Sequence, residues 1–168
     1  MGNDFCATPY DTGKPFFFFE DLESLEKKMK QHDVEEVELS YQGSDANHLA
    51  LFDHCDVTPA NFEEYVEYID NLSYPSEIVA LLYLLEDLGY TLEDAKGKLE
   101  DVCVYPGTPS DYAYELINDC YNLKEMMGDL ANYFDYDSFT RDLITGGDVC
   151  EVEFANEGTF TITNANCI

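Results

Sequence analysis

The sequence predicts an α+β fold: an elongated chain made of a small α/β unit, a short helical bundle, and a mixed α/β C-terminal unit with a β-hairpin. Apolar side chains recur at helical spacing through the middle of the chain. They alternate with polar side chains near both ends, which is typical of half-exposed strands. The composition is 45% hydrophobic and 14% aromatic, enough to build a core despite a net charge of −28.

Residues 1–57 are expected to form the small α/β N-terminal domain. After a turn-prone segment, an aromatic run indicates a short buried strand, an amphipathic segment indicates a helix, and an alternating segment indicates a half-exposed strand. These elements are predicted over residues 16–19, 20–30 and 37–41, with a further strand around residues 5–10. Residues 43–57 are polar and are expected to be an irregular boundary.

Residues 58–103 are expected to form a helical bundle. Thr58-Pro59 is a good helix start, because a capping residue is followed by proline in the first turn. A second helix is predicted from Ser76; it is apolar nearly all round, which indicates a central buried helix ended by Gly89. Thr91, with an acidic residue three positions later, resembles a capping box for a third helix.

Residues 104–168 are expected to form a C-terminal α+β domain with acidic helices and a hairpin. Thr108-Pro109 repeats the helix start signal, and Gly146-Gly147 ends the helical stretch. Alternating segments before and after residues 156–158 indicate the hairpin. The stretch from 110 to 147 has an apolar frame expected to pack: Leu116, Ile117, Met127, Leu130, Phe134, Phe139 and Leu143.

The charge is spread along the whole chain, with 36 acidic and 8 basic residues. The three predicted parts carry −9, −9 and −10, which excludes an acidic tail or linker as its source. Solubility needs a net charge of only about 2–8 in a small domain. Twenty-eight charges match roughly 48 Å of B-DNA, which has one charge per ~1.7 Å. Salt adaptation is another explanation, and direct binding to nucleic acid is disfavoured without a basic patch.

No catalytic constellation, metal site or cofactor motif is found, so the protein is not expected to be an enzyme. The three histidines share one polar region but lack the spacings of structural zinc sites. The segment from Asp135 begins like a calcium-binding loop, but Phe139, Thr140 and Gly146 occupy positions that need a ligand, a glycine and a glutamate. Pairs of acidic residues arise by chance at this composition.

The six cysteines are far apart, without a CxxC motif, and are expected to be reduced, buried thiols. No signal peptide and no apolar run near the ~20 residues of a membrane span is present. The sequence therefore predicts a soluble, cytoplasmic protein.

Three segments resemble the ArdA antirestriction proteins: YLLEDLGYTLEDAKGKLEDVCVYPGTPSDYAYELINDCY from residue 83, YFDYDSFTRDL from 133, and FTITNAN from 160. The similarity covers roughly residues 60–168, and the N-terminal segment looks like a shortened version of the family's first domain. The resemblance implies an elongated homodimer of three-part chains that imitates bent B-form DNA. It also implies binding to type I restriction–modification enzymes, on the specificity and methyltransferase subunits, by a protein of mobile genetic elements such as plasmids, transposons and phages.

We expect the helical carboxylates to replace DNA phosphates. Individually each is more typical of a solvated helix face, and only the collective imbalance favours a binding surface. The predicted residues are Glu63, Glu67, Asp70, Glu86, Asp87, Glu93, Asp94, Asp111, Glu115, Asp119, Asp129, Asp135, Asp137 and Asp142. Alternatives are a DNA mimic against another target (a CRISPR effector or a nucleoid protein), a generic acidic protein-interaction module, or a hydrolase using one carboxylate pair. We expect Leu116, Phe134, Phe139 and Leu143 in the core or a dimer contact.

Overall fold

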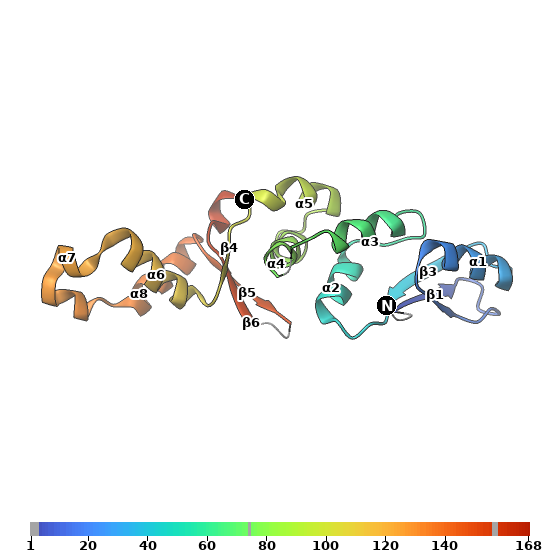
Figure 1. Cartoon of the computed structure of the whole chain (residues 1–168), viewed down its shortest axis with the longest axis horizontal. Helices are drawn as coiled ribbons and strands as arrows, with labels where there is room; N and C mark the ends of the chain where they lie inside the picture. Colours follow the sequence, from blue (N-terminus) through green and yellow to red (C-terminus); the bar gives the residue numbers. More distant parts are fainter. Residues whose placement is uncertain (1–3, 74, 156–157) are drawn as a thin grey trace. The chain divides into compact units, whose positions relative to one another are not determined.

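The computed structural model describes residues 4–73, 75–155 and 158–168, and the chain divides into two compact units, Met1–Ser73 and Tyr74–Ile168 (Figure 1). Each unit combines helices with a three-stranded antiparallel sheet. The predicted α+β class is therefore confirmed.

The sheet of the first unit has the strand order β2-β1-β3. Its strands are β1 (Phe5–Pro9), β2 (Phe17–Phe19) and β3 (Val37–Tyr41), all close to the predicted positions. Helix α1 (Leu22–His32) connects β2 to β3. It begins with a capping box in which the Asp21 carboxylate accepts the Ser24 amide at 2.7 Å, so its start is fixed locally.

The prediction of an irregular boundary over residues 43–57 is wrong, because helix α2 (Ala46–His54) lies within it. The Asp45 carboxylate caps this helix by accepting the amides of Asn47 and His48 at 2.9 and 3.2 Å. Leu51 and Phe52 bury one face of α2 in the core. A nine-residue helix with two buried apolar side chains has too little periodicity to stand out from a polar loop.

Helix α3 (Phe62–Asp70) begins later than the predicted start at Thr58-Pro59. The side-chain oxygen of Asn61 accepts the Thr58 amide at 2.6 Å, which closes a turn before the helix. Phe62 and Tyr65 then enter an aromatic core, where the Phe62 ring lies 4.9 Å from Phe5 and 5.2 Å from Phe19 between centroids. Helix α3 thus belongs to the first unit, and the division into three domains stays a prediction.

The second unit begins with the helix predicted to be central and buried. Helix α4 (Ser76–Leu82) continues as a π-helical turn, η1 (Tyr83–Asp87), and every residue from 78 to 85 is buried. The wider turn was not predicted; the Leu88 amide donates to the Tyr83 carbonyl at 3.2 Å. Gly89, at φ 69°, follows it, and helix α5 (Leu92–Lys98) with the 3-10 turn η2 (Leu99–Asp101) comes next.

The second sheet has the order β4-β6-β5. The predicted hairpin is confirmed as β5 (Cys150–Phe154) and β6 (Gly158–Ile162), antiparallel with Val152 opposite Phe160. Its residues 156–157 lie outside the described part. Strand β4 (Val104–Pro106) was not predicted, because it pairs with residues 160–162, far along the chain.

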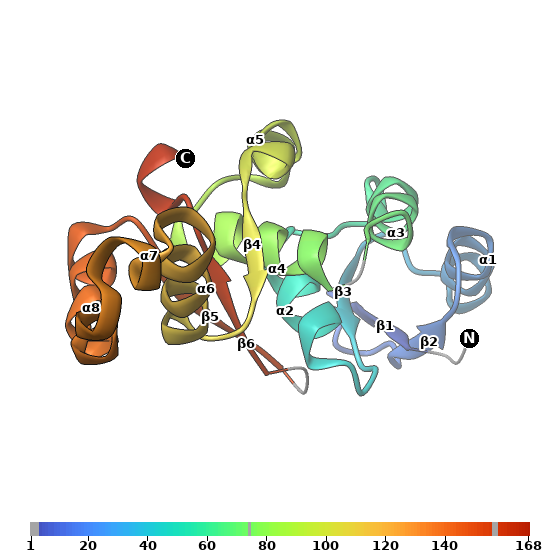
Figure 2. The same ribbon diagram turned by 60° about the vertical axis from the view of Figure 1, so that its left-hand side comes forward.

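The acidic stretch forms several short helices. They are α6 (Pro109–Tyr121), α7 (Leu123–Met127), the 3-10 helix η3 (Gly128–Tyr133) and α8 (Tyr136–Gly146), and a 3-10 turn η4 (Ala165–Cys167) lies near the C-terminus. Asn122, at φ 40°, breaks α6 from α7, and Gly147, at φ 78°, ends α8 as predicted. Figure 2 shows α6 and α8 side by side, in agreement with their contacts.

The six cysteines are free thiols, but the expectation that they are buried is only partly right. Cys6 and Cys55 are buried, whereas Cys103, Cys120 and Cys167 are exposed. Over the described residues, no helix is both long enough and apolar enough to cross a membrane.

Candidate functional site

All fourteen predicted carboxylates are exposed, and they lie in both units. Among the described acidic side chains only Asp4, Glu77 and Asp148 are half-buried, and none is buried. The candidate residues lie on α3 (Glu63, Glu67, Asp70), at the end of η1 (Glu86, Asp87), on the first turn of α5 (Glu93, Asp94), on α6 (Asp111, Glu115, Asp119), in η3 (Asp129), and on α8 and its cap (Asp135, Asp137, Asp142).

On α3 the carboxylates form a stripe because the opposite side of the helix is fixed in the core. Phe62, Tyr65 and Ile69 are at most 3% exposed, so Glu63 and Glu67 project outward. Two residues four positions apart lie one above the other, about 6 Å apart along the helix axis. Along one DNA strand, a phosphate and the second phosphate after it are separated by roughly 6.8 Å along the duplex axis. The two axial steps are of similar length.

Helix α6 repeats this arrangement. Its buried side carries Ala113 and Ile117, at 0% and 5% exposure, while Asp111, Glu115 and Asp119 recur every four residues on the exposed side. Three anions thus follow one edge of a 13-residue helix. The stripe has the same ~6 Å step as that of α3.

Some of these carboxylates are held in place by helix caps. Asp111 accepts the Thr108 hydroxyl at 2.6 Å and the Thr108 amide at 3.0 Å, and these bonds hold the pKa of Asp111 below its ordinary value. At the start of α8, the Ser138 amide and hydroxyl bind Asp135 at 2.9 and 2.7 Å and lower its pKa in the same way. Hydrogen bonds to the ionised form thus keep these anions both charged and oriented.

Glu86 and Asp87 are placed differently, because they lie at the C-terminal end of a buried helix. The helix dipole is negative at that end and disfavours carboxylates. Asp87 also contributes, after burial, to raising the pKa of Tyr83 and of the Cys150 thiol. The helix dipole therefore does not favour a carboxylate at Asp87.

The apolar frame that was expected to pack over residues 110–147 is packed only in part. Leu116, Phe134, Phe139 and Leu143 are half-buried and Ile117 is buried, but Leu130 is 63% exposed. Met126, Met127 and Tyr133 are also exposed, at 71%, 42% and 84%. We call Met126, Met127, Leu130 and Tyr133 the apolar tip. In the sequence, the helix-breaking residues Asn122 and Gly128 were the features that could have indicated that residues 126–133 do not pack in the core.

Several of the few cationic side chains bind groups of their own unit. The Lys14 ammonium donates to the His32 carbonyl at 3.0 Å, and the Lys98 ammonium lies 5.6 Å from the centroid of the Tyr90 ring. Lys28 donates to the Phe18 carbonyl. Because these three lysines are held by local contacts, their charges do not neutralise the carboxylates of the α3 and α6 stripes.

The family model described as "Antirestriction protein (ArdA)" matches residues 3–159 of the 168. No curated protein matches the chain. The match therefore extends to the N-terminal segment, beyond the similarity noted over roughly residues 60–168.

Proposed function

Because this chain belongs to the ArdA antirestriction family, we propose that it imitates B-form DNA and competitively occupies the DNA-binding groove of a type I restriction–modification enzyme. The contacts are assigned to the specificity and methyltransferase subunits. The observation that carries the proposal is the exposure of all fourteen carboxylates, which form stripes on α3 and α6 opposite the buried faces of these helices. The protein acts in the cytoplasm as a counter-defence factor of a mobile element, without catalysis, a cofactor or direct binding to nucleic acid.

The physical basis is competition for a positive groove. A DNA-binding enzyme gains affinity when its cations displace the counterions of phosphates. Carboxylates on a folded helix offer the same exchange, and they lose less ordering entropy on binding than flexible ones. Because they present no base edges, inhibition is independent of the recognition sequence.

The test is displacement of labelled DNA from a purified type I methyltransferase at two salt concentrations. We expect displacement that weakens as salt rises. No displacement would direct the search to another DNA-binding target, such as a CRISPR effector or a nucleoid protein. Salt-resistant binding would favour a generic interaction module instead.

A matched pair of variants separates geometry from net charge. One variant neutralises the stripes of α3 and α6 with Glu63→Gln, Glu67→Gln, Glu115→Gln and Asp119→Asn. The control neutralises four exposed acids outside the proposed surface: Glu23, Glu35, Glu36 and Glu38 to Gln. We expect the stripe variant to lose about 10–100-fold in affinity, since each exposed contact contributes under about 1 kcal/mol. Equal losses in both variants would show that charge alone matters, without DNA-like placement.

We also propose that the chain forms a homodimer through the apolar tip. Association of two chains of net charge −28 is opposed by repulsion, so it needs buried apolar area. Tyr133 and Leu130, at 84% and 63% exposure, supply such area. Leu130→Ser with Tyr133→Ser should raise the dimer dissociation constant in sedimentation equilibrium. Tyr10→Ser, at a residue 66% exposed in the first unit, is the control and should not change it.

A further inference from the structure

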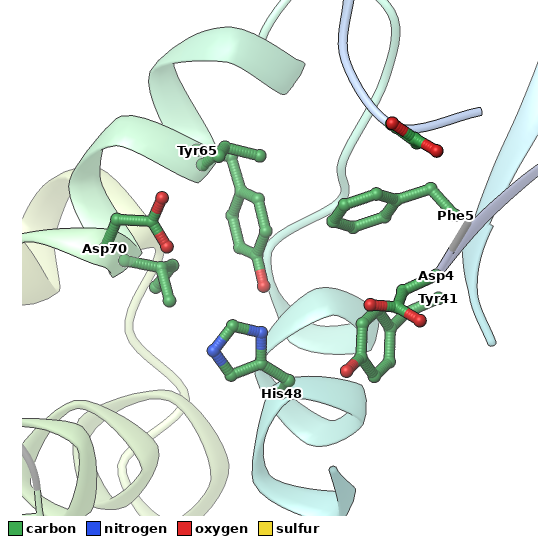
Figure 3. A pocket seen from close by; sticks show the side chains of 9 residues that line it. Asp4, Phe5, Tyr41, His48, Tyr65 and Asp70 are labelled. Carbon is green, nitrogen blue, oxygen red and sulfur yellow. The ribbon is translucent and has the colours of Figure 1, made fainter. Parts of the chain in front are cut away.

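A pocket of about 150 Å³ lies inside the first unit, among α2, α3 and the sheet (Figure 3). Aromatic rings from three elements line it: Phe5 from β1, Tyr41 from β3 and Tyr65 from α3. The pocket could not be predicted from the sequence, because these residues meet only in the folded unit.

The hydroxyl of Tyr65 is the unusual group in this pocket. Tyr65 is 3% exposed, and its hydroxyl has no hydrogen-bond partner among the described residues. Figure 3 shows the ring between Asp70 and Phe5, with the hydroxyl directed toward His48. Burial raises the pKa of Tyr65, so the phenol stays neutral and can both donate and accept. Buried polar groups are normally paired, so an unused hydroxyl on a residue that lines a pocket leaves a hydrogen-bonding position for a bound molecule.

The charge of the lining defines the chemistry of that partner. Asp4, Glu20 and Asp70 place three carboxylates around the aromatic rings. Carboxylates beside aromatic faces favour an organic cation, which gains from both the charge and the ring quadrupole. A metal ion is not favoured, because within residues 4–73 no group of three or more His, Cys, Asp or Glu side chains could hold one.

Among organic cations, a guanidinium fits this lining best. It is planar, stacks on aromatic rings, and has five N–H donors that can serve a carboxylate and a hydroxyl together. An ammonium is a compact, strongly hydrated charge. Its transfer from water into an aromatic pocket therefore costs more hydration free energy than the transfer of a guanidinium. Arginine is also the side chain with which DNA-binding proteins most often contact phosphates and guanines.

We propose that this pocket receives the guanidinium of an arginine from the target enzyme. That the arginine belongs to a restriction–modification enzyme rests on the proposed function; the affinity of the pocket for a guanidinium does not. A cation enclosed by rings and carboxylates is a stronger anchor than an exposed ion pair. The pocket therefore adds one localised contact to a surface whose other contacts are individually weak.

Tyr65→Phe is the informative variant because its effects on stability and binding differ in sign. Removing an unpaired buried hydroxyl should leave the melting temperature unchanged or raise it. The same change removes a hydrogen bond to a charged ligand, which should weaken binding by about tenfold. A purely structural role for the hydroxyl predicts a lower melting temperature with unchanged binding.

The direct test titrates N-acetyl-L-arginine amide into the full-length protein and follows the ring resonances of His48 and Phe5 by NMR. Saturable shifts are expected with this probe. They should weaken in Tyr65→Phe and Asp70→Asn, but not in Tyr10→Phe or Glu23→Gln, which lie outside the pocket lining. The neutral isostere N-acetyl-L-citrulline amide should cause no saturable shift. Absence of shifts with the arginine probe, or equal binding of N-acetyl-L-lysine amide, would overturn the proposal.

The DNA-displacement assay distinguishes this inference from the proposed function. Displacement by the wild-type protein without arginine-probe binding would overturn the pocket and leave DNA mimicry standing. Probe binding without displacement would support the guanidinium site while contradicting the type I target. If both succeed, Tyr65→Phe should weaken displacement by about the same tenfold as it weakens probe binding.

Discussion

At the scale of single residues, the position of a carboxylate within its helix decides its effect on stability. Asp94 lies in the first turn of α5 and accepts the Thr91 hydroxyl at 2.8 Å, whereas Asp87 ends η1. The first is favoured by the helix dipole, and the second is disfavoured. The same charge therefore has opposite effects on stability at the two sites.

Neutralising these two residues should change stability in opposite directions. We expect Asp87→Asn to raise the free energy of unfolding by about 0.3–1 kcal/mol, and Asp94→Asn to lower it by about the same amount. Urea denaturation followed by far-UV circular dichroism at low salt measures both, since the chain has no Trp. A loss of stability in Asp87→Asn would mean that its local contacts outweigh the dipole.

The cap of α6 predicts a pH dependence. The pKa of Asp111 is lowered from 3.8, so its stabilising contribution is fully present above that value and is lost as pH falls through the lower folded pKa. Asp111→Asn should therefore be less stable than wild type at pH 6. The difference should shrink as pH falls below 3.8. Urea midpoints at pH 6, 4 and 3 test this; a constant difference would contradict it.

The caps could be predicted from the sequence where the signal is local. Thr91 and Thr108, each with an acidic residue three positions later, form the expected interactions. The start of α3 could not be predicted, because Asn61 competes with Thr58-Pro59 through its own turn. The helix begins three residues after the predicted start, where Phe62 enters the core.

At the scale of elements, the continuous α4–η1 helix is the core of the second unit. Leu84 is fully buried, whereas Leu88, at the other end of the same turn, is 40% exposed. Helix α4 was predictable from its apolar run, but the π-helical turn depends on a shift of backbone hydrogen bonds that leaves no compositional sign. Strand β4 was likewise missed because its partner is β6, more than 50 residues away.

Truncation of the buried Leu84 should lower the free energy of unfolding of the second unit. We expect Leu84→Ala to cost about 2–5 kcal/mol, through lost burial and the cavity left behind. Leu88→Ala should cost much less, because its side chain is already partly hydrated. Amide hydrogen exchange in the β5–β6 hairpin measures the effect within the second unit. Similar losses for the two variants would contradict a core centred on this helix.

At the scale of the whole molecule, charge has opposite effects on folding and on binding. A net charge of −28 destabilises compact units by self-repulsion, while the same charge is proposed to attract the target. Composition alone was enough to predict an exposed acidic surface. It could not predict the pocket, whose lining joins residues as distant as Asp4 and Asp70.

Added salt should therefore stabilise the protein and weaken its inhibition. Between 50 mM and 500 mM NaCl we expect the melting temperature to rise, because screening reduces repulsion between exposed carboxylates. Over the same range, the affinity for the methyltransferase should fall. Calorimetry and the displacement assay measure the two trends. A melting temperature that falls with salt would show that favourable ion pairs outweigh repulsion.

The capping carboxylates have a consequence for how such a protein can diverge. Asp111 and Asp135 cap the helices that they begin, and they also belong to the proposed binding surface. An acid such as Glu115, which meets only the second requirement, can be exchanged for a neighbour when the target changes. As such sequences diverge, we expect the acidic residues at the cap positions to be retained and those at the stripe positions to be replaced more often. The acidic residues at the helix starts would then stay the same, while the other acidic residues of the surface would vary.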